Sequence, residues 1–98
     1  MTPVGRFTID AHHPSLAGHF PGRPVVPGVV LLDHAICAIL ATQGARAAGL
    51  PSVKFTRPVL PGQPVVVACD PPRDGRIAFL CTVDGAPVAR GTLALQPG

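Results

Sequence analysis

The feature that most constrains the fold is an apolar stretch at residues 29–41, which opens a predicted helix over residues 29–48 in a chain of 98 residues. When this stretch is drawn as a helix, apolar side chains cover almost its whole surface: Val29, Val30, Leu31, Leu32, Ala35, Ile36, Ala38, Ile39 and Leu40. A helix that is apolar nearly all round is stable only when most of its faces are buried. Gly49 and Pro51 follow the stretch and predict that the helix ends near Ala48.

The rest of the chain is typical of β-structure. Runs rich in Val and Leu occupy residues 52–56, 63–69, 76–83 and 88–95, and residues 6–9 predict a short first strand. The turn-forming sequences RPVLPG, DPPRDG and DGAP separate the later runs, and the pair Asp84–Gly85 predicts a hairpin. Strands joined by such short turns are antiparallel. The sequence therefore predicts one α+β domain over residues 1–98, with an antiparallel sheet wrapped around one long central helix.

Composition excludes several classes of protein. An apolar content of 47% argues against disorder. The N-terminus lacks a signal-peptide pattern, and the apolar stretch is interrupted by Asp33 and His34 and is too short to span a bilayer. The net charge of +3 is spread over scattered side chains, and the chain has no Tyr or Trp on which bases could stack. We therefore expect a cytoplasmic protein without a nucleic-acid or membrane partner, whose positive surface suits an acidic ligand or protein.

Cysteine usage and chain length support the same interpretation. Cys37, Cys69 and Cys81 are odd in number and do not have the spacing of metal ligands. We expect them to be buried, reduced thiols in a cytosolic protein. A chain of this length builds only a small core, so a partner subunit is a natural source of further stability.

One segment, GHFPGRPVVPGVVLLDH at residues 18–34, combines residues suited to acid–base chemistry. His19 lies in a stiff Pro- and Gly-rich loop, and histidine transfers protons well near neutral pH. Gly28 stands at the predicted helix start, where backbone N–H groups lack intrahelical acceptors and attract an oxyanion. Asp33 is a carboxylate inside an apolar helix, where burial favours its neutral, proton-donating form.

Each of these features also has a structural interpretation. The histidine ring is easily satisfied by a backbone group, a Pro-Gly pair is a common turn, and the aspartate can be a cap or a structural hydrogen-bonding group. Together, however, a base, an acid and an oxyanion donor at one helix N-terminus suit proton abstraction next to a carbonyl.

The same segment resembles the active-site segment of the β-hydroxyacyl–acyl carrier protein dehydratases, which have the hot-dog fold. It carries the pattern His-Phe-Pro-Gly-x-Pro-Val-x-Pro-Gly-Val, with a carboxylate fourteen positions after the histidine. The later stretch KFTRPVLPGQPVVV resembles the next strand and turn of that family, so the likeness extends over about residues 13–67.

The resemblance implies a role for each site residue. His19 would take the C2 proton of a 3-hydroxyacyl thioester, and Asp33 would protonate the departing hydroxyl. The Gly28 N–H would bind the thioester oxygen, with the Val29 N–H as a second donor, and the Val25 carbonyl would orient the His19 ring. The product would be a trans-2-enoyl thioester, formed without cofactor or metal, and the acid would come from the other subunit of a homodimer or larger assembly.

Departures from the family pattern leave the substrate open. Many members carry Glu where this chain has Asp33, and a branch that also isomerises the double bond carries Asp; the shorter side chain alone does not imply isomerisation. The sequence HHPSLAGH stands where the fatty-acid enzymes have bulky aromatic residues. The short chain resembles the small dehydratases of specialised pathways, such as those that make aryl polyenes or other polyketide-like chains. Arg23, Lys54 and Arg57 are the expected contacts for an acidic acyl carrier protein.

Three alternatives remain open at this point. A hot-dog thioesterase would also use the helix N-terminus, although it does not need a base and an acid that flank C2 and C3. A non-catalytic subunit that binds acyl carrier protein is also compatible with the fold, although such a subunit would be expected to lack His19 or Asp33. Asp10, His12, His13 and His19 are metal-ligand types, but adjacent histidines on extended chain point in different directions. His34 is expected to pack or to face solvent rather than to act in the site.

Overall fold

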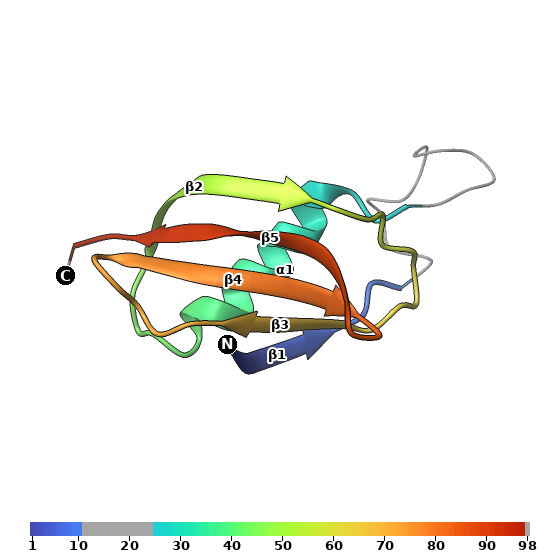
Figure 1. Cartoon of the computed structure of the whole chain (residues 1–98), viewed down its shortest axis with the longest axis horizontal. Helices are drawn as coiled ribbons and strands as arrows, with labels where there is room; N and C mark the ends of the chain where they lie inside the picture. The colour runs from blue at the N-terminus through green and yellow to red at the C-terminus, as the bar shows by residue number, and fades with distance from the viewer. Residues whose placement is uncertain (11–24, 98) are drawn as a thin grey trace.

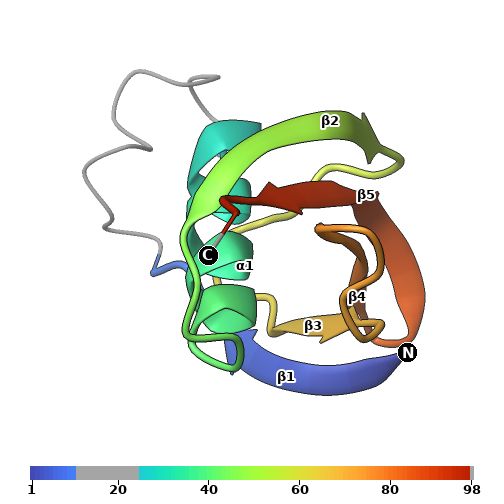
Figure 2. The same cartoon turned by 90° about the vertical axis from the view of Figure 1, so that its left-hand side faces the viewer.

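The structure is a computed structural model that describes residues 1–10 and 25–97. Along the chain its elements are β1 (Thr2–Phe7), α1 (Gly28–Leu40), β2 (Ala47–Phe55), β3 (Val65–Cys69), β4 (Arg76–Val83) and β5 (Ala86–Leu95). The five strands form one antiparallel sheet in the order β1-β3-β4-β5-β2. The sheet curls around α1, which lies against its concave side (Figures 1 and 2). The predicted α+β architecture is therefore confirmed.

One row of helix residues forms the centre of the contact with the sheet. Leu31, Ala35 and Ile39 are spaced four residues apart and are buried against the inward-facing side chains of the sheet. Along β3 and β4 these side chains alternate with outward-facing ones. The largest fully buried side chains of the sheet are Phe79, Ile77, Leu93, Val65, Val67 and Cys81. On the β1 side the approach is closest at Gly5, where a Cβ atom would lie 2.8 Å from the Ala38 Cβ. Glycine at this position lets the helix sit directly on the strand.

The hairpin predicted at Asp84–Gly85 is present between β4 and β5. Asp84 and Gly85 have φ angles of 51° and 80°, as a two-residue type I′ turn requires. The strand predicted at residues 76–83 is also correct to the residue. In the described ranges, no helix is long and apolar enough to cross a membrane.

The predicted helix end near Ala48 is wrong. α1 stops at Leu40, where the Gly44 N–H donates to the Leu40 carbonyl and Gly44 adopts a left-handed φ of 62°. Gly44, rather than Gly49, is thus the glycine that closes the helix. The residues from Ala47 onward instead pair with β5, because that pairing satisfies their backbone groups along the sheet edge.

In the single chain, α1 is buried or half-buried on most faces, as expected, except along one stripe. Val29, Asp33 and Cys37 form an exposed stripe along the helix, opposite the buried one, and the Val29 side chain is 75% exposed. Two of the cysteines, Cys69 and Cys81, are buried free thiols as expected, whereas Cys37 is exposed. Burial raises the pKa of the Cys81 thiol to about 11.

Candidate active site

The N-terminus of α1 presents backbone N–H groups that lack a capping side chain. Pro27 is the N-cap residue, and its carbonyl accepts hydrogen bonds from the N–H groups of Val30 and Leu31 at 3.0 and 3.1 Å. The N–H groups of Gly28 and Val29 have no acceptor among the described residues. They stand at the positive end of the helix dipole, and no acidic residue occupies the first turn. Such a pair is suited to bind a carbonyl oxygen that gains negative charge.

Gly28 lies beneath the ring of Phe55, at the end of β2. A Cβ atom on residue 28 would come within 2.6 Å of the Phe55 Cζ, so only glycine allows this approach. The Phe55 side chain is 49% exposed, which is unusual for a large apolar side chain that also contacts the helix. The ring therefore forms one wall beside the helix N-terminus, and its other face meets solvent.

A cleft of about 400 Å³ opens at this place. Its walls come from the segment before α1, from the first turns of α1 and from the chain that leaves β2: Val25, Val26, Gly28, Leu31, Phe55, Thr56, Arg57, Pro58 and Val59. The Val26 N–H donates to the Val59 carbonyl at 2.8 Å and joins the two sides. The cleft is largely apolar, with Arg57 as its charged side chain, and a thioester could bring its oxygen to the helix end there.

The predicted site residues are only partly brought together. Val25 and Gly28 share the cleft, and Val29 is the next residue on the helix. Asp33 lies one turn beyond Val29 on the exposed stripe and faces away from the core of its own chain. The expectation of a buried Asp33 is therefore wrong for the single chain. His19 and Arg23 lie outside the described residues, as do His12 and His13, so their roles stay predictions.

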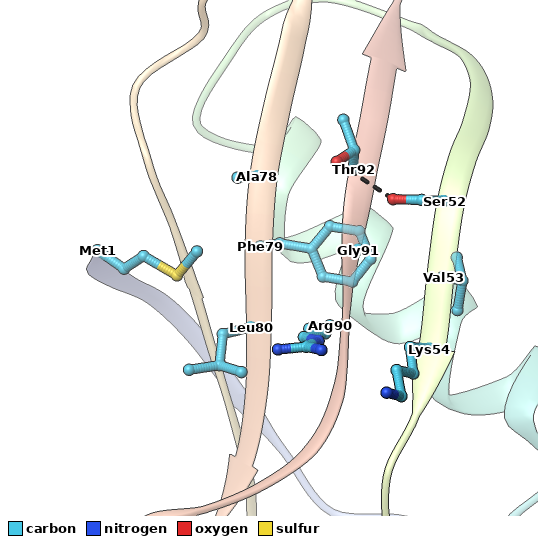
Figure 3. Close-up of a pocket in the computed structure, with 10 residues that line it drawn as sticks. All are labelled: Met1, Ser52, Val53, Lys54, Ala78, Phe79, Leu80, Arg90, Gly91 and Thr92. Carbon is cyan, nitrogen blue, oxygen red and sulfur yellow. Dashed lines mark hydrogen bonds between the residues drawn. The ribbon is translucent and has the colours of Figure 1, made fainter.

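The two remaining docking candidates lie on different surfaces. Arg57 lines the cleft beside Gly28. Lys54 lies instead in a shallow depression on the outer face of the sheet, with Arg90, Leu80 and Met1 (Figure 3). Strand alternation explains why Lys54 lies away from the cleft. Lys54 and the adjacent Phe55, which lines the cleft together with Arg57, must point to opposite faces of β2.

Phe55 is a cleft residue that was not predicted from the sequence. It belongs to the stretch KFTRPVLPGQPVVV, in which the sequence predicted a docking role for Lys54 and Arg57 only. The alternation of Lys54 and Phe55 would have placed the ring on the helix side of β2. Its contact with Gly28 joins residues far apart in the sequence, and no local pattern predicts it.

His34 packs against its neighbours, which is one of the two outcomes expected for it, the other being exposure to solvent. Its Nδ1 lies 3.0 Å from the Val30 carbonyl, which can only accept, so Nδ1 carries the proton. The ring stacks on Phe7 of β1 with a centroid separation of 4.9 Å. In the described ranges, no cluster of three or more His, Cys, Asp or Glu residues is arranged to hold a metal ion.

Comparison with solved structures identifies the fold. The chain is similar to a structure described as the dehydratase heterocomplex ApeI:P from Xenorhabdus doucetiae, with a TM-score of 0.80, 22% identity, and coverage of 94% of this chain and 84% of that chain. The structure of an uncharacterized protein from Erwinia carotovora subsp. atroseptica matches with a TM-score of 0.77 and 23% sequence identity, and the match covers 99% of this chain and 98% of that chain. The structure of a mutant of the fluoroacetyl-CoA-specific thioesterase FlK matches with a TM-score of 0.66 and 14% sequence identity, and the match covers 94% of this chain and 86% of that chain. These structures share the hot-dog fold, which confirms the predicted fold.

The family is shown by the sequence itself. A model of the family described as ApeI-like, ApeI dehydratase, matches residues 2–92, which is nearly the whole chain. The match includes the motif at residues 18–34, the helix N-terminus, and β2 with the segment that follows it, which line the cleft. The chain therefore belongs to the ApeI-like dehydratase family.

Proposed function

We propose that this dehydratase converts a 3-hydroxyacyl thioester, carried by acyl carrier protein, to a trans-2-enoyl thioester. The pathway we propose builds a fatty-acid or polyketide-like chain, of which an aryl polyene is one example. The observation that carries the proposal is the pair of uncapped N–H groups on Gly28 and Val29 beside an apolar cleft. Elimination from a thioester needs such a pair, because negative charge develops on the thioester oxygen when C2 loses its proton.

The proposed reaction divides the proton transfers between two side chains. His19 removes the proton from C2, and the Gly28 and Val29 N–H groups bind the oxygen on which the charge gathers. The bond from C3 to its hydroxyl oxygen then breaks, Asp33 donates a proton to that oxygen, and water leaves as the C2–C3 double bond forms. Solvent returns the proton from His19 to Asp33. A general base contributes about 10²–10⁴-fold in rate, and an oxyanion donor about 10²–10³-fold.

The placement of Asp33 supports a site shared between two subunits. In one chain its carboxylate faces away from the core, on the same stripe as the exposed side chain of Val29. Half-buried apolar side chains flank this stripe: Leu32, Ile36 and Leu40. An apolar helix face with one carboxylate is suited to pack on a second copy and to donate a proton to that copy's cleft. We therefore propose a homodimer in which each cleft takes its acid from the partner.

The similar ApeI:P structure is described as a heterocomplex, so a different second chain is the alternative partner. Native mass spectrometry of the purified chain separates the two cases. A dimer that dehydrates substrate supports the homodimer. A monomer that gains activity only with a second, different chain contradicts it.

Two variants test the reaction. His19→Ala and Asp33→Asn are each expected to lower dehydration of a 3-hydroxyacyl thioester by about 10²-fold or more. Asp33→Glu, which keeps a carboxylic acid, is the matched control and should retain more activity than Asp33→Asn. Product mass spectrometry identifies the reaction, since an enoyl thioester shows dehydration whereas a free acid with released thiol shows hydrolysis. Hydrolysis as the main reaction, or a folded His19→Ala variant within threefold of wild type, would contradict the proposal.

A further inference from the structure

The fold gathers cations that are scattered along the sequence. Arg6 of β1, Lys54 of β2, Arg76 of β4 and Arg90 of β5 are four of the eight Lys and Arg residues, and all four are exposed. The neighbours of these cations on the same strands point inward, as at Ile77 beside Arg76. The four side chains therefore project from the outer, convex face of the sheet, away from α1. We call these four residues the basic sheet face.

The surface between these cations is formed by apolar side chains and contains a depression. It includes Ala78 and Leu80 of β4, which line a depression of about 540 Å³ together with Lys54 and Arg90 (Figure 3). Small side chains leave the sheet open to close approach by another surface. On the β2 side, the hydroxyls of Ser52 and Thr92 lie 3.4 Å apart.

Lys54 and Arg90 are direct cross-strand partners in the register of β2 and β5. Like charges that face each other in this way destabilise a sheet. None of the four cations has an acidic partner in the described part of the chain, where the N-terminal amine is the group that pairs with Asp70, at 3.4 Å. The other described acids in the second half of the chain, Asp74 and Asp84, lie in turns. An anionic partner from outside the chain would relieve the repulsion.

The spacing indicates the size of that partner. Arg6 and Arg90 lie on strands three steps apart in the sheet, or roughly 14 Å at about 4.8 Å per step. Arg76 lies four residues from Leu80, roughly 13 Å along β4. A single phosphate or carboxylate reaches no more than one or two of these cations. A protein surface that carries several carboxylates can reach all of them.

We propose that the basic sheet face is a docking surface for an acidic protein, and that its occupant is the thioester carrier. The choice of occupant rests on the proposed function and on position. Lys54 is followed directly by Phe55, Thr56 and Arg57, which line the cleft beside Gly28. A carrier seated over Lys54 and Arg90 therefore stands at the end of β2, where its thioester arm enters the cleft.

Arg90→Glu and Lys54→Glu test the proposal with two substrates that carry the same acyl group, one on the carrier protein and one on a short thioester. Each reversal is expected to lower kcat/KM for the carrier-bound substrate about tenfold or more and for the short thioester less than twofold. The defect should shrink as salt rises from about 0.05 to 0.5 M, because salt screens exposed charges. Arg46→Glu is the matched control, since Arg46 is exposed but lies between α1 and β2, off the face.

A binding measurement keeps this test independent of turnover. Fluorescence anisotropy of labelled carrier protein should show weaker binding to Arg90→Glu than to wild type and to Arg46→Glu. Equal losses on both substrates, or unchanged binding with both reversals, overturn the docking role. Tighter binding of a DNA duplex than of the carrier also overturns it. Failure of the proposed function is a separate result, since wild type would then give no enoyl product from the short thioester while the binding difference persists.

Discussion

Replacing Gly28 by alanine tests the helix N-terminus as an oxyanion site. The new Cβ would lie 2.6 Å from Cζ of Phe55 and 3.0 and 3.1 Å from its two Cε atoms. Carbon atoms normally approach to about 3.5–4.0 Å, so the end of the ring must withdraw by about 1 Å. The methyl group and the displaced ring would then occupy the space from which a thioester oxygen reaches the Gly28 N–H.

Stability should change little in Gly28→Ala. The Phe55 ring is about half exposed, so it can move toward solvent at a cost of about 0.5–1.5 kcal/mol for an off-rotamer side chain. Alanine restricts the unfolded chain more than glycine does, which returns about 0.4–1 kcal/mol. These opposing changes nearly cancel, and the melting temperature should stay within about 5 °C of wild type.

Activity should fall much further. Loss of an oxyanion donor lowers the rate by about 10²–10³-fold, and we expect a loss of that order in kcat/KM on a short 3-hydroxyacyl thioester. Gly49→Ala is the matched control on β2, because a Cβ there meets nothing within 4 Å; its activity should be unchanged and its stability should rise by about 0.4–1 kcal/mol. Gly28→Ala with kcat/KM within threefold of wild type would refute the oxyanion role. A fall in melting temperature of more than about 15 °C would refute the reasoning that Phe55 can yield.

Three further outcomes follow from the fold and the proposed site. Gly91→Ala should destabilise the fold by about 1–3 kcal/mol in urea unfolding, because its Cβ would clash with the backbone oxygen of Ser52, which cannot move away. Equal stability of Gly91→Ala and Gly49→Ala would contradict this. The pKa of the Cys81 thiol is raised to about 11 in the folded chain, so the unfolded thiol, with a pKa near 9, loses its proton first. The free energy of unfolding should therefore be full below about pH 9 and fall as pH rises through about 11. In Cys81→Ala the urea midpoint should change less with pH over this range, and an equal pH dependence in both proteins would count against the reasoning. His19→Ala and Asp33→Asn, unfolded and refolded together, should recover about a quarter of wild-type activity if the site is shared, whereas an inactive mixture with mixed dimers present would exclude sharing.

Local sequence patterns predicted those parts of the fold that local chemistry decides. The Asp84–Gly85 turn needs two residues with positive φ, and few pairs other than Asp-Gly supply them. The strand Arg76–Val83 is an apolar run bounded by the turn sequences DPPRDG and DGAP, and these turns were sufficient to place both of its ends. The helix end was misplaced because alanine-rich residues 45–48 have good helix propensity, yet pairing with β5 decided their structure.

The features missed at the candidate site depend on contacts between distant residues or between chains. The approach of Phe55 to Gly28 joins a strand end to a helix end. The basic sheet face arises only when all five strands pair, because β3 lies between β1 and the other strands that carry the cations. The sequence predicted burial for most faces of α1, and the single chain leaves exposed one stripe that includes Val29 and Asp33. If a second copy covers that stripe, the apolar pattern of the helix describes the assembly rather than the isolated chain.

The register of β2 links the cleft to the outer face of the sheet. Phe55 pairs with the buried Ala89 and Lys54 pairs with the exposed Arg90, so adjacent residues serve opposite sides. A slip of one residue would place Lys54 over Gly28 and turn the Phe55 ring outward. Two hydrogen bonds of Thr56 oppose such a slip: its N–H donates to the Val88 carbonyl and its hydroxyl to the Pro87 carbonyl, each at 2.9 Å. The close approach of Gly91 to the Ser52 carbonyl adds a steric constraint, because a residue with a side chain could not occupy that place. The pairing of β2 with β5, more than the identity of any one exposed residue, therefore determines whether the cleft and the basic sheet face exist together.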